Sequence, residues 1–386
     1  MKIIQSILDT DLYKLTQMNA VMATHPSLKV KYKFTDRNGT IYPKGFAHEL
    51  SFEVTKMSEL CLKDSEAEYL ETLDLFPPHF IEVLKSYRFD PKELKITQDP
   101  EGHLEIGIEG FWWKTILWEV PLMALISELY FIETNQEVDI HGFAGKDIDK
   151  AVLMSKHGAH FADFGTRRRY SFANQERIVD LFKSMGYKEF VGTSNVHLAM
   201  TNRVKPIGTM AHEWIMVYAA LYGYKMANKL ALEGWADVYD GDLGIALSDT
   251  FTTGVFFKTF TKKLAKLFDG VRHDSGDAFE FTDKVIAHYK SLGIDPMSKV
   301  IVFSDGLNPQ LAVEIKEYCV GKIKSSFGIG TNFSNDVGVK PLNIVIKVSD
   351  VLIEDDWYPC VKLSDNHGKH TGDRNEIKLC KGILRI

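Results

Sequence analysis

The residues best suited to chemistry in this chain lie in short polar turns that follow apolar runs. The stretch Lys205–Trp214, KPIGTMAHEW, delivers His212 at the start of an apolar, helix-like segment. Free backbone N–H groups and the positive end of a helix dipole favour anions at such a position. His212 is therefore either a hydrogen-bonded histidine at a helix start or a group facing phosphate chemistry. Taken alone, the stretch favours the first interpretation.

Arginine- and glycine-containing turns elsewhere in the chain favour the second interpretation. DFGTRRRY places Arg167–Arg169 beside Phe164. Guanidinium groups bind phosphate or carboxylate oxygens in a forked geometry, and a phenylalanine can face a flat ring. The alternatives are a solvated helix start for one or two of the arginines and a core position for Phe164. SDGLN (Ser304–Asn308) and FGIGTN (Phe327–Asn332) are glycine turns whose backbone N–H groups suit a phosphate, or ordinary tight turns.

The turn VRHDSGD combines basic and acidic groups that suit a phosphorylated sugar. Arg272 can hold a phosphate, and Asp274 can hold sugar hydroxyls or metal-bound water, although Asp/Arg turns also form structural ion pairs. These turns together predict a ligand with phosphates and hydroxyls, and they indicate Mg²⁺. The chain lacks a GxSxG-type serine, a nucleophilic cysteine motif, a Walker loop and a GxGxxG turn. We also find no lysine within an apolar strand, as a Schiff-base enzyme would need.

The elements that must position these turns are repeated β–turn–α units beginning near residue 140. About seven apolar runs each end in small or charged residues, and most of them precede a helical pattern. Such alternation predicts a parallel sheet, and seven to eight units fit an irregular, closed or nearly closed (β/α) barrel. The strand ends would then gather on one face, which carries Asp163, Arg167, Thr193, Ser194, His212, Asp249, Arg272, Asp274, Asp305 and Gly330.

The N-terminal part has a different pattern. It predicts a helix ending near Pro26, a strand over 28–36, helices within 46–86, a β-hairpin over 93–111 and a long apolar helix over 115–133. We therefore expect a smaller α+β domain over residues 1–135, completed by about 350–386, and a barrel domain over 136–349.

Composition excludes several classes of protein. The chain has 386 residues, 45% hydrophobic and 25% charged, with a net charge of −6, so it has no broad electrostatic footprint for nucleic acid. Its four cysteines lack metal-ligand spacing and are typical of free thiols in a reducing compartment. The most apolar run is interrupted by Glu119, Pro121 and Glu128, which argues against a membrane span. The N-terminus lacks a signal peptide, so we expect a cytoplasmic protein.

The ordered motifs resemble one family. DTDLYKLTQ, DFGTRRRYS, GTSNVHLA, GTMAHEW, VRHDSGD, FSDGLNP and FGIGTN, in this order, closely resemble nicotinate phosphoribosyltransferase, from about residue 9 to the end of the chain. The resemblance implies a type II phosphoribosyltransferase that joins nicotinate to PRPP, releases pyrophosphate and couples this to ATP hydrolysis in NAD salvage. It also implies Mg²⁺, a barrel with a second α/β domain, and a homodimer with shared active sites.

The resemblance also implies roles for particular residues. His212 would be transiently phosphorylated by ATP, with Asp249 supporting it. Phe164 and a partner subunit's Tyr13 would enclose the pyridine ring, while Arg167 would hold the carboxylate or a neighbouring phosphate. The remaining substrate contacts would come from Thr193 and Ser194 near the base, Asp274 and Asp305 at the ribose hydroxyls, Arg272, Gly306 and Gly330 at the 5′-phosphate, and a partner's Arg37 at the phosphates.

Three other functions compete with this one. Nicotinamide phosphoribosyltransferase has an Asp in the turn corresponding to Ser194, where a carboxylate would repel nicotinate, so the neutral Ser194 favours the acid. Quinolinate phosphoribosyltransferase would need a more basic site. A non-catalytic barrel that binds a phosphorylated metabolite would be expected to have lost catalytic groups, yet every expected position is occupied.

Overall fold

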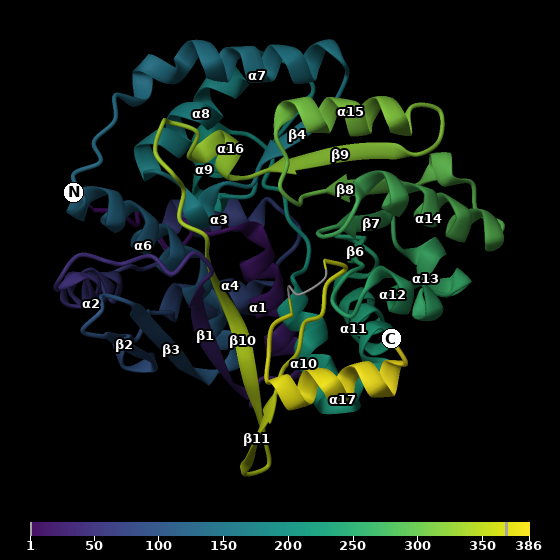
Figure 1. Ribbon diagram of the computed structural model, residues 1–386, viewed down its shortest axis with the longest axis horizontal. Helices are drawn as coiled ribbons and strands as arrows, with labels where there is room; N and C mark the ends of the chain where they lie inside the picture. The colour runs from purple at the N-terminus through teal and green to yellow at the C-terminus, as the bar shows by residue number, and fades with distance from the viewer. Residues whose placement is uncertain (1, 367–369) are drawn as a thin grey trace.

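The structure, a computed structural model, describes residues 2–366 and 370–386, and it contains two separate β-sheets (Figure 1). One sheet is antiparallel with five strands, and the other is parallel with six. The expected α/β class with a second, smaller sheet is confirmed.

The antiparallel sheet joins the two ends of the chain. Its order is β11-β10-β1-β3-β2. The strands are β1 (Lys29–Asp36), β2 (Leu94–Gln98), β3 (Leu104–Phe111), β10 (Ile344–Ile353) and β11 (Asp356–Pro359). β1 lies between β3 and β10, and its alternate residues Val30, Tyr32 and Phe34 are buried, as the period of two in its sequence requires. Strands β10 and β11 near the C-terminal end therefore complete this sheet. The division at residue 349 stays a prediction, and that residue lies within β10.

The parallel sheet holds the strand ends that carry the motifs. Its order is β5-β4-β9-β8-β7-β6. The strands are β4 (His160–Asp163), β5 (Phe190–Thr193), β6 (Ile245–Leu247), β7 (Gly270–His273), β8 (Val300–Phe303) and β9 (Lys324–Ile329). No strand pairing joins β5 to β6 within the described residues, so the sheet is not a closed barrel there.

The apolar run KPIG, one of the roughly seven runs of the β–turn–α pattern, forms no strand of the parallel sheet. Within residues 205–208 the structure places only an isolated parallel bridge, between Pro206 and Thr193. Proline has no N–H to donate to a strand ladder, which accounts for the short pairing. The described parallel sheet therefore has six strands rather than the seven to eight predicted.

Helices precede, connect and follow the strands of the parallel sheet. They are α7 (Ala144–Lys156), α8 (Phe172–Ser184), α9 (Val196–Asn202), α10 (His212–Tyr222), α11 (Tyr224–Tyr239), α12 (Thr253–Thr259), α13 (Lys262–Leu267), α14 (Ala278–Ser291), α15 (Pro309–Cys319) and α16 (Thr331–Ser334). Ser171, Asn195, Asp277 and Asn308 cap helix starts by accepting hydrogen bonds from backbone N–H groups. Several polar residues that follow strands are thus helix caps.

The remaining helices pack around the antiparallel sheet or close the chain. They are α1 (Leu12–Thr24), α2 (Phe46–Met57), α3 (Asp64–Glu71), α4 (Pro78–Ser86), α5 (Trp112–Thr115), α6 (Glu119–Glu133) and α17 (Arg374–Leu384), with short 3₁₀ turns at Pro91–Glu93, Ile116–Trp118, Ile140–Phe143, Thr166–Arg168 and Pro296–Ser298. Among the described residues, Trp112–Glu133 is the one helical stretch long and apolar enough to cross a membrane, and most of it is buried inside the protein. A core helix of a globular protein has this property.

Candidate active site

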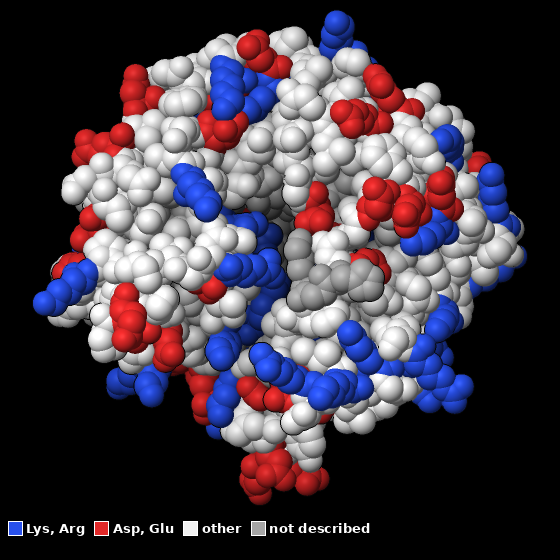
Figure 2. Space-filling model, in the orientation of Figure 1, with Lys and Arg blue, Asp and Glu red and all other residues white. Residues whose placement is uncertain are grey.

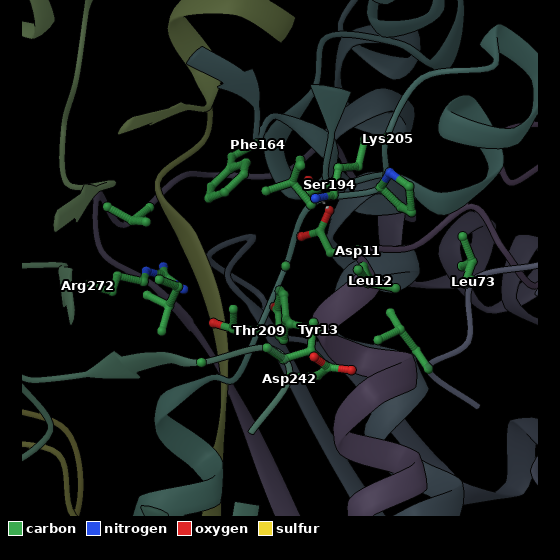
Figure 3. A pocket seen from close by; sticks show the side chains of 18 of the residues that line it. Asp11, Leu12, Tyr13, Leu73, Phe164, Ser194, Lys205, Thr209, Asp242 and Arg272 are labelled. Carbon is green, nitrogen blue, oxygen red and sulfur yellow. Dashed lines mark hydrogen bonds between the residues drawn. The ribbon is translucent and has the colours of Figure 1, made fainter. Parts of the chain in front are cut away.

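A cavity of about 550 Å³ lies between the start of α1 and the parallel sheet (Figure 3). It reaches from the residues that follow β4 and β5 to the amino ends of β6 and β7. Its lining includes Tyr13, Phe164, Arg167, Ser194 and Arg272. A second, smaller cavity of about 50 Å³ shares three of its lining residues with the first, which are Tyr13, Arg167 and Arg272. Lys and Arg side chains border a hollow near the centre of the face seen in Figure 2. The structure therefore brings residues from distant motifs to one place.

Two aromatic side chains face the larger cavity. Phe164 follows β4, and its ring lies against Gly328 of β9, where an added Cβ would be only 2.3 Å from the ring. Tyr13 lies at the start of α1, where Gly208 approaches its backbone so closely that a Cβ would be 2.9 Å from the Tyr13 nitrogen. Both glycines are thus required by close packing. We expected Tyr13 to come from a partner subunit, but the chain's own Tyr13 lines the cavity.

The three consecutive arginines have different surroundings. Arg167 lines both cavities, with its Nε 3.8 Å from Asp11 and its Nη1 3.9 Å from Glu119. Arg168 is partly buried, and burial, with the neighbouring charges of Arg167 and Arg37, lowers its pKa to about 10. Arg167 is the arginine best placed to meet a bound anion.

Arg169 has a structural role. It is completely buried and donates to both carboxylate oxygens of Asp9, at 2.7 and 2.9 Å. Its backbone carbonyl accepts a hydrogen bond from Ser127 of α6. Arg169 is therefore not one of the arginines that could form a solvated helix start. A bidentate pair of this kind fixes the N-terminal segment against the parallel sheet.

A buried network organises the ends of β4 and β5. The Thr193 hydroxyl donates to Asp163 at 2.7 Å, and Gln175 also donates to this carboxylate. Burial raises the pKa of Asp163 to about 6. The Ser194 hydroxyl donates to Asp11 at 2.7 Å. Ser194 lines the cavity, whereas Thr193 is fully buried and positions Asp163.

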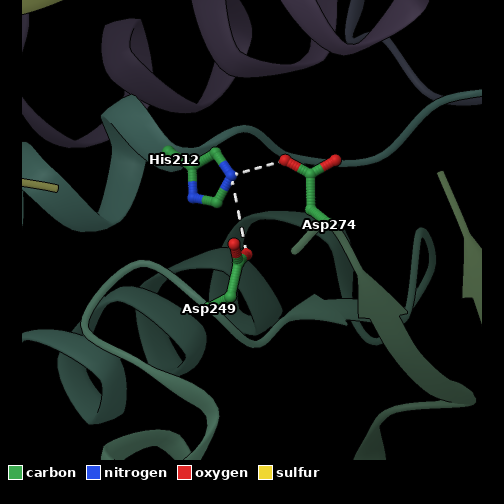
Figure 4. Close-up of side chains that lie close together, drawn as sticks. All are labelled: His212, Asp249 and Asp274. Atoms are coloured by element: carbon green, nitrogen blue, oxygen red, sulfur yellow. Dashed lines mark hydrogen bonds and ion pairs between the residues drawn. The ribbon is translucent and has the colours of Figure 1, made fainter. Parts of the chain in front are cut away.

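His212 is the first residue of α10, and its ring faces Asp249 and Asp274 (Figure 4). It lines the smaller cavity. Its Nε2 lies 2.8 Å from Asp274 Oδ2 and 3.6 Å from Asp249 Oδ1, while its Nδ1 lies 3.0 Å from the Thr250 hydroxyl. Burial and the positive charge of Lys362 lower the pKa of His212 to about 4. The imidazole is therefore neutral at physiological pH and keeps a lone pair.

The residues around His212 are held in turn. Arg272 donates to Asp274 Oδ1 at 2.8 Å and to the Ser304 hydroxyl at 2.8 Å. Ser275 donates to Asp249 at 2.6 Å. The ion pair allowed for VRHDSGD is thus formed, and it lies within the site because Arg272 lines both cavities.

The other residues predicted at the ribose hydroxyls and phosphates do not line these two cavities. Asp305 and Gly306 follow β8, and Gly330 precedes α16. Arg37 follows β1 in this same chain, and its charge and that of Asp305 both act on Arg168. Their predicted roles stay predictions, as do those of the residues lining the cavities.

Sequence reasoning missed several charged groups. Lys347 lies in β10 within IVIKV and lines the smaller cavity, so the statement that no lysine stands in an apolar strand is wrong. Burial lowers the pKa of Lys347 to about 8. Lys362 Nζ lies 2.9 Å from His212 Nε2. The strand pattern of LNIVIKV was the signal for Lys347, whereas nothing local to Lys362 predicts its contact.

Two further acidic residues meet the site from the N-terminal part. Asp11 lines the larger cavity and Glu119 the smaller one. Glu119 also lies 2.6 Å from Lys14 Nζ, and buried Lys14 contacts Glu213 as well. Burial raises the pKa of Asp11. The site is therefore not purely basic.

The described residues contain one cluster whose atoms approach metal-ligand spacing, formed by His212, Asp249 and Asp274 within 4.8 Å of one another. The Lys362 ammonium group already lies among them, 3.4 Å from Asp249 and 3.9 Å from Asp274. Mg²⁺ prefers oxygen ligands, and a cation and a nitrogen donor at this point do not suit it. The cluster does not fit Mg²⁺, so we assign the ion no protein ligand.

Comparisons with known proteins match the whole chain. The model of the nicotinate phosphoribosyltransferase (NAPRTase) N-terminal domain matches residues 8–127, and the NAPRTase family model matches residues 159–385. Proteins named nicotinate phosphoribosyltransferase from Desulforapulum autotrophicum and Chromohalobacter salexigens are each 48% identical, with 99% of both chains covered.

Solved structures give the same result. The crystal structure of nicotinate phosphoribosyltransferase from Porphyromonas gingivalis has a TM-score of 0.98 and 46% identity, covering 100% of both chains. The structure from Vibrio cholerae has a TM-score of 0.92 and 34% identity, covering 100% of this chain and 94% of that one.

Proposed function

The chain belongs to the nicotinate phosphoribosyltransferase family, and we propose that it joins nicotinate to PRPP, forming nicotinate mononucleotide and pyrophosphate for NAD salvage. The observation that carries this proposal is the pair of cavities that share Tyr13, Arg167 and Arg272. An aromatic, cationic pocket thus adjoins a site with a neutral histidine and a held carboxylate.

The larger cavity suits nicotinate. Phe164 and Tyr13 offer rings to the flat pyridine, and Arg167 offers a guanidinium group to its carboxylate. Ser194 contributes a neutral side chain, and its hydroxyl is already donated to Asp11. In this arrangement the acid is attracted through Arg167. Asp11 is a carboxylate that could instead accept from an amide, so nicotinamide is the alternative substrate that the experiments must include.

Arg272 and Asp274 suit the phosphorylated ribose of PRPP. Arg272 would meet a phosphate, with Gly306, Gly330 and Arg37 completing the phosphate contacts, and Asp274 and Asp305 would meet the ribose hydroxyls. The pyridine nitrogen of nicotinate forms the bond to the anomeric carbon as the bond to pyrophosphate breaks, and the leaving group takes the electron pair. Since this nitrogen is already a nucleophile, the residues need only orient the reactants and stabilise developing charge.

His212 is proposed to accept the γ-phosphoryl group of ATP. Its neutral imidazole forms the nitrogen–phosphorus bond while the bond from the γ-phosphorus to the bridging oxygen breaks, and ADP leaves with that electron pair. The start of α10 and the nearby lysines favour the resulting negative charge. Asp249, 3.6 Å away, would support the imidazole. Mg²⁺ is proposed to accompany the phosphates of PRPP and ATP.

The proposed assembly is a homodimer, and the proposed location is the cytoplasm. A homodimer with shared active sites remains a prediction, as does the contact of a partner's Tyr13, while this chain's own Tyr13 lines the larger cavity. A cytoplasmic location also remains a prediction. The described cysteines are all free thiols, in keeping with it.

The test is to incubate the protein with PRPP, Mg²⁺ and nicotinate or nicotinamide, with and without γ-labelled ATP. We expect nicotinate mononucleotide, ADP and transient label on the protein. His212→Ala should abolish the label and the stimulation by ATP, while slow transfer without ATP can survive. Label persisting in His212→Ala would refute the role of His212. A mononucleotide formed from nicotinamide but not from nicotinate would refute nicotinate as the substrate.

A further inference from the structure

The His212 Nε2 atom lies within hydrogen-bond distance of two groups with opposite requirements. Asp274 Oδ2 is 2.8 Å away and Lys362 Nζ is 2.9 Å away. A carboxylate can only accept a hydrogen bond, whereas an ammonium group can only donate one. Nε2 can satisfy the first only when it carries a proton and the second only when it does not.

The Asp274 carboxylate is fixed in the accepting state. Its other oxygen, Oδ1, already accepts hydrogen bonds from Arg272 at 2.8 Å and from the Ser304 hydroxyl at 3.0 Å. These donors hold the carboxylate ionised and aim Oδ2 at the imidazole. The pKa of Asp274 lies well below its usual value, since Arg272 and His212 outweigh the effect of burial.

The position of Lys362 is equally well defined. Its backbone pairs with Thr371 in both directions, at 2.9 and 2.8 Å, and the N–H of Leu363 donates to the Thr250 carbonyl at 2.8 Å. The Lys362 side chain is only 12% exposed, so the surrounding protein keeps its ammonium group close to the imidazole. Asp249 Oδ2, 3.4 Å away, is its alternative partner.

The opposite nitrogen of the ring can adapt to either arrangement. Nδ1 lies 3.0 Å from the Thr250 hydroxyl, which can donate or accept. With Lys362 donating to Nε2, the proton sits on Nδ1 and Thr250 accepts it. With Asp274 accepting from Nε2, Thr250 can donate to the bare Nδ1. Both neutral tautomers therefore keep all their hydrogen bonds, and the competition at Nε2 decides between them.

We propose that Lys362 is a positioning residue that sets the tautomer of His212. In the free protein its ammonium group holds Nε2 as an acceptor, so the proton sits on Nδ1. Phosphate groups that enter the smaller cavity compete for the Lys362 ammonium group. When that group leaves the imidazole, Nε2 can carry a proton and donate a hydrogen bond to Asp274. The ring loses the Nδ1 proton to solvent and takes one from solvent on Nε2, so it stays neutral. The Nδ1 lone pair, which then only accepts from the rotatable Thr250 hydroxyl, can take the phosphoryl group when that hydroxyl turns away. This coupling rests on the proposed function, because it gives phosphate binding a means of activating the phosphoryl acceptor.

The tautomer is measured by nitrogen-15 NMR of the full-length protein labelled at histidine, without substrates. A difference spectrum against His212→Gln assigns the His212 signals, which distinguish a protonated ring nitrogen from a bare one. We expect the Nδ1–H tautomer in the wild type and the Nε2–H tautomer in Lys362→Met. Lys347→Met is the matched control, because Lys347 lines the same cavity without a contact to the imidazole among the described hydrogen bonds. It should keep the Nδ1–H tautomer.

A conservative variant and a probe complete the test. Lys362→Arg keeps a donor and should retain the Nδ1–H tautomer, which separates loss of the donor from general disruption. Inorganic pyrophosphate with Mg²⁺ should convert the wild type to Nε2–H and leave Lys362→Met unchanged. A wild type already in the Nε2–H form, an unchanged tautomer in Lys362→Met, or no conversion by pyrophosphate would overturn the proposal. Failure to make nicotinate mononucleotide would instead refute the proposed function, since the tautomer of the free protein is measured without turnover.

Discussion

Gly328→Ala tests whether the position of Phe164 creates the nicotinate pocket. The new Cβ would be 2.3 and 2.4 Å from two ring carbons of Phe164 and 2.9 Å from a third. Carbon atoms in ordinary contact are about 3.5–4.0 Å apart, so the ring must move by about 1 Å or more. β9 is held by pairing with both β4 and β8, so the ring has to move towards the cavity.

The expected effect is on ligand binding more than on folding. Stacking of one aromatic pair is worth about 0.5–1.5 kcal/mol, which corresponds to roughly a 2- to 10-fold loss of nicotinate affinity. Overpacking costs about 1–3 kcal/mol of unfolding free energy, and the open cavity places this variant near the lower end. Titration calorimetry with nicotinate gives the affinity, and urea unfolding gives the stability.

Gly107→Ala is the control, because an added Cβ at this β3 position meets no atom within 4 Å. It should leave nicotinate affinity unchanged. In a Phe164→Leu background, Gly328→Ala should have a smaller effect on affinity, because the two substitutions act through the same ring. Wild-type affinity in a folded Gly328→Ala variant, or full additivity with Phe164→Leu, would refute the placement of nicotinate against Phe164.

Three other predictions follow from the same contacts. Asp9→Asn leaves the buried Arg169 without its counter-charge and should lower the free energy of unfolding in urea by about 3–5 kcal/mol. The control Asp180→Asn changes an exposed residue and should alter it by no more than about 0.5 kcal/mol. Equal stabilities of the two variants would contradict the structural role of the Asp9–Arg169 pair. His212 is nucleophilic only when neutral, and its pKa is lowered to about 4. The rate at which ATP labels the protein should therefore stay level as the pH falls from about 8 to about 5.5. A rate that falls by half near the ordinary histidine pKa of about 6.5 would argue against the buried environment of His212. Ser194→Asp places a second carboxylate beside Asp11 and should lower kcat/KM for nicotinate relative to nicotinamide by about tenfold or more, so an unchanged ratio would show that Ser194 does not face the acid.

The sequence predicted the parts of the fold that depend on local patterns. The hairpin of β2 and β3, the helix α1 and the shared antiparallel sheet all agree with period-two or helical spacing. KPIG was misread because an apolar run with a turn resembles a strand, although its proline cannot continue a ladder. Whether the parallel sheet closes into a barrel could not be predicted from local patterns, since closure depends on pairing between its two edge strands.

The candidate site was predictable where a motif follows a strand. Phe164, Arg167 and Arg272 line the cavities because their strands end at the same edge of the sheet. The contact of Lys362 with His212 is not predictable from local sequence, because the two residues lie 150 positions apart in the chain. The resemblance assigns a partner's Tyr13 to the site, which stays a prediction, whereas the packing of Gly208 against α1 places this chain's own Tyr13 at the cavity.

The most direct measurement is a competition between substrates. The protein is incubated with PRPP, Mg²⁺, ATP and equal concentrations of nicotinate and nicotinamide, and the mononucleotides are identified by mass spectrometry. The pocket formed by Phe164, Tyr13 and Arg167 predicts that nicotinate mononucleotide is the dominant product. Dominant nicotinamide mononucleotide, or no mononucleotide at all, would contradict it.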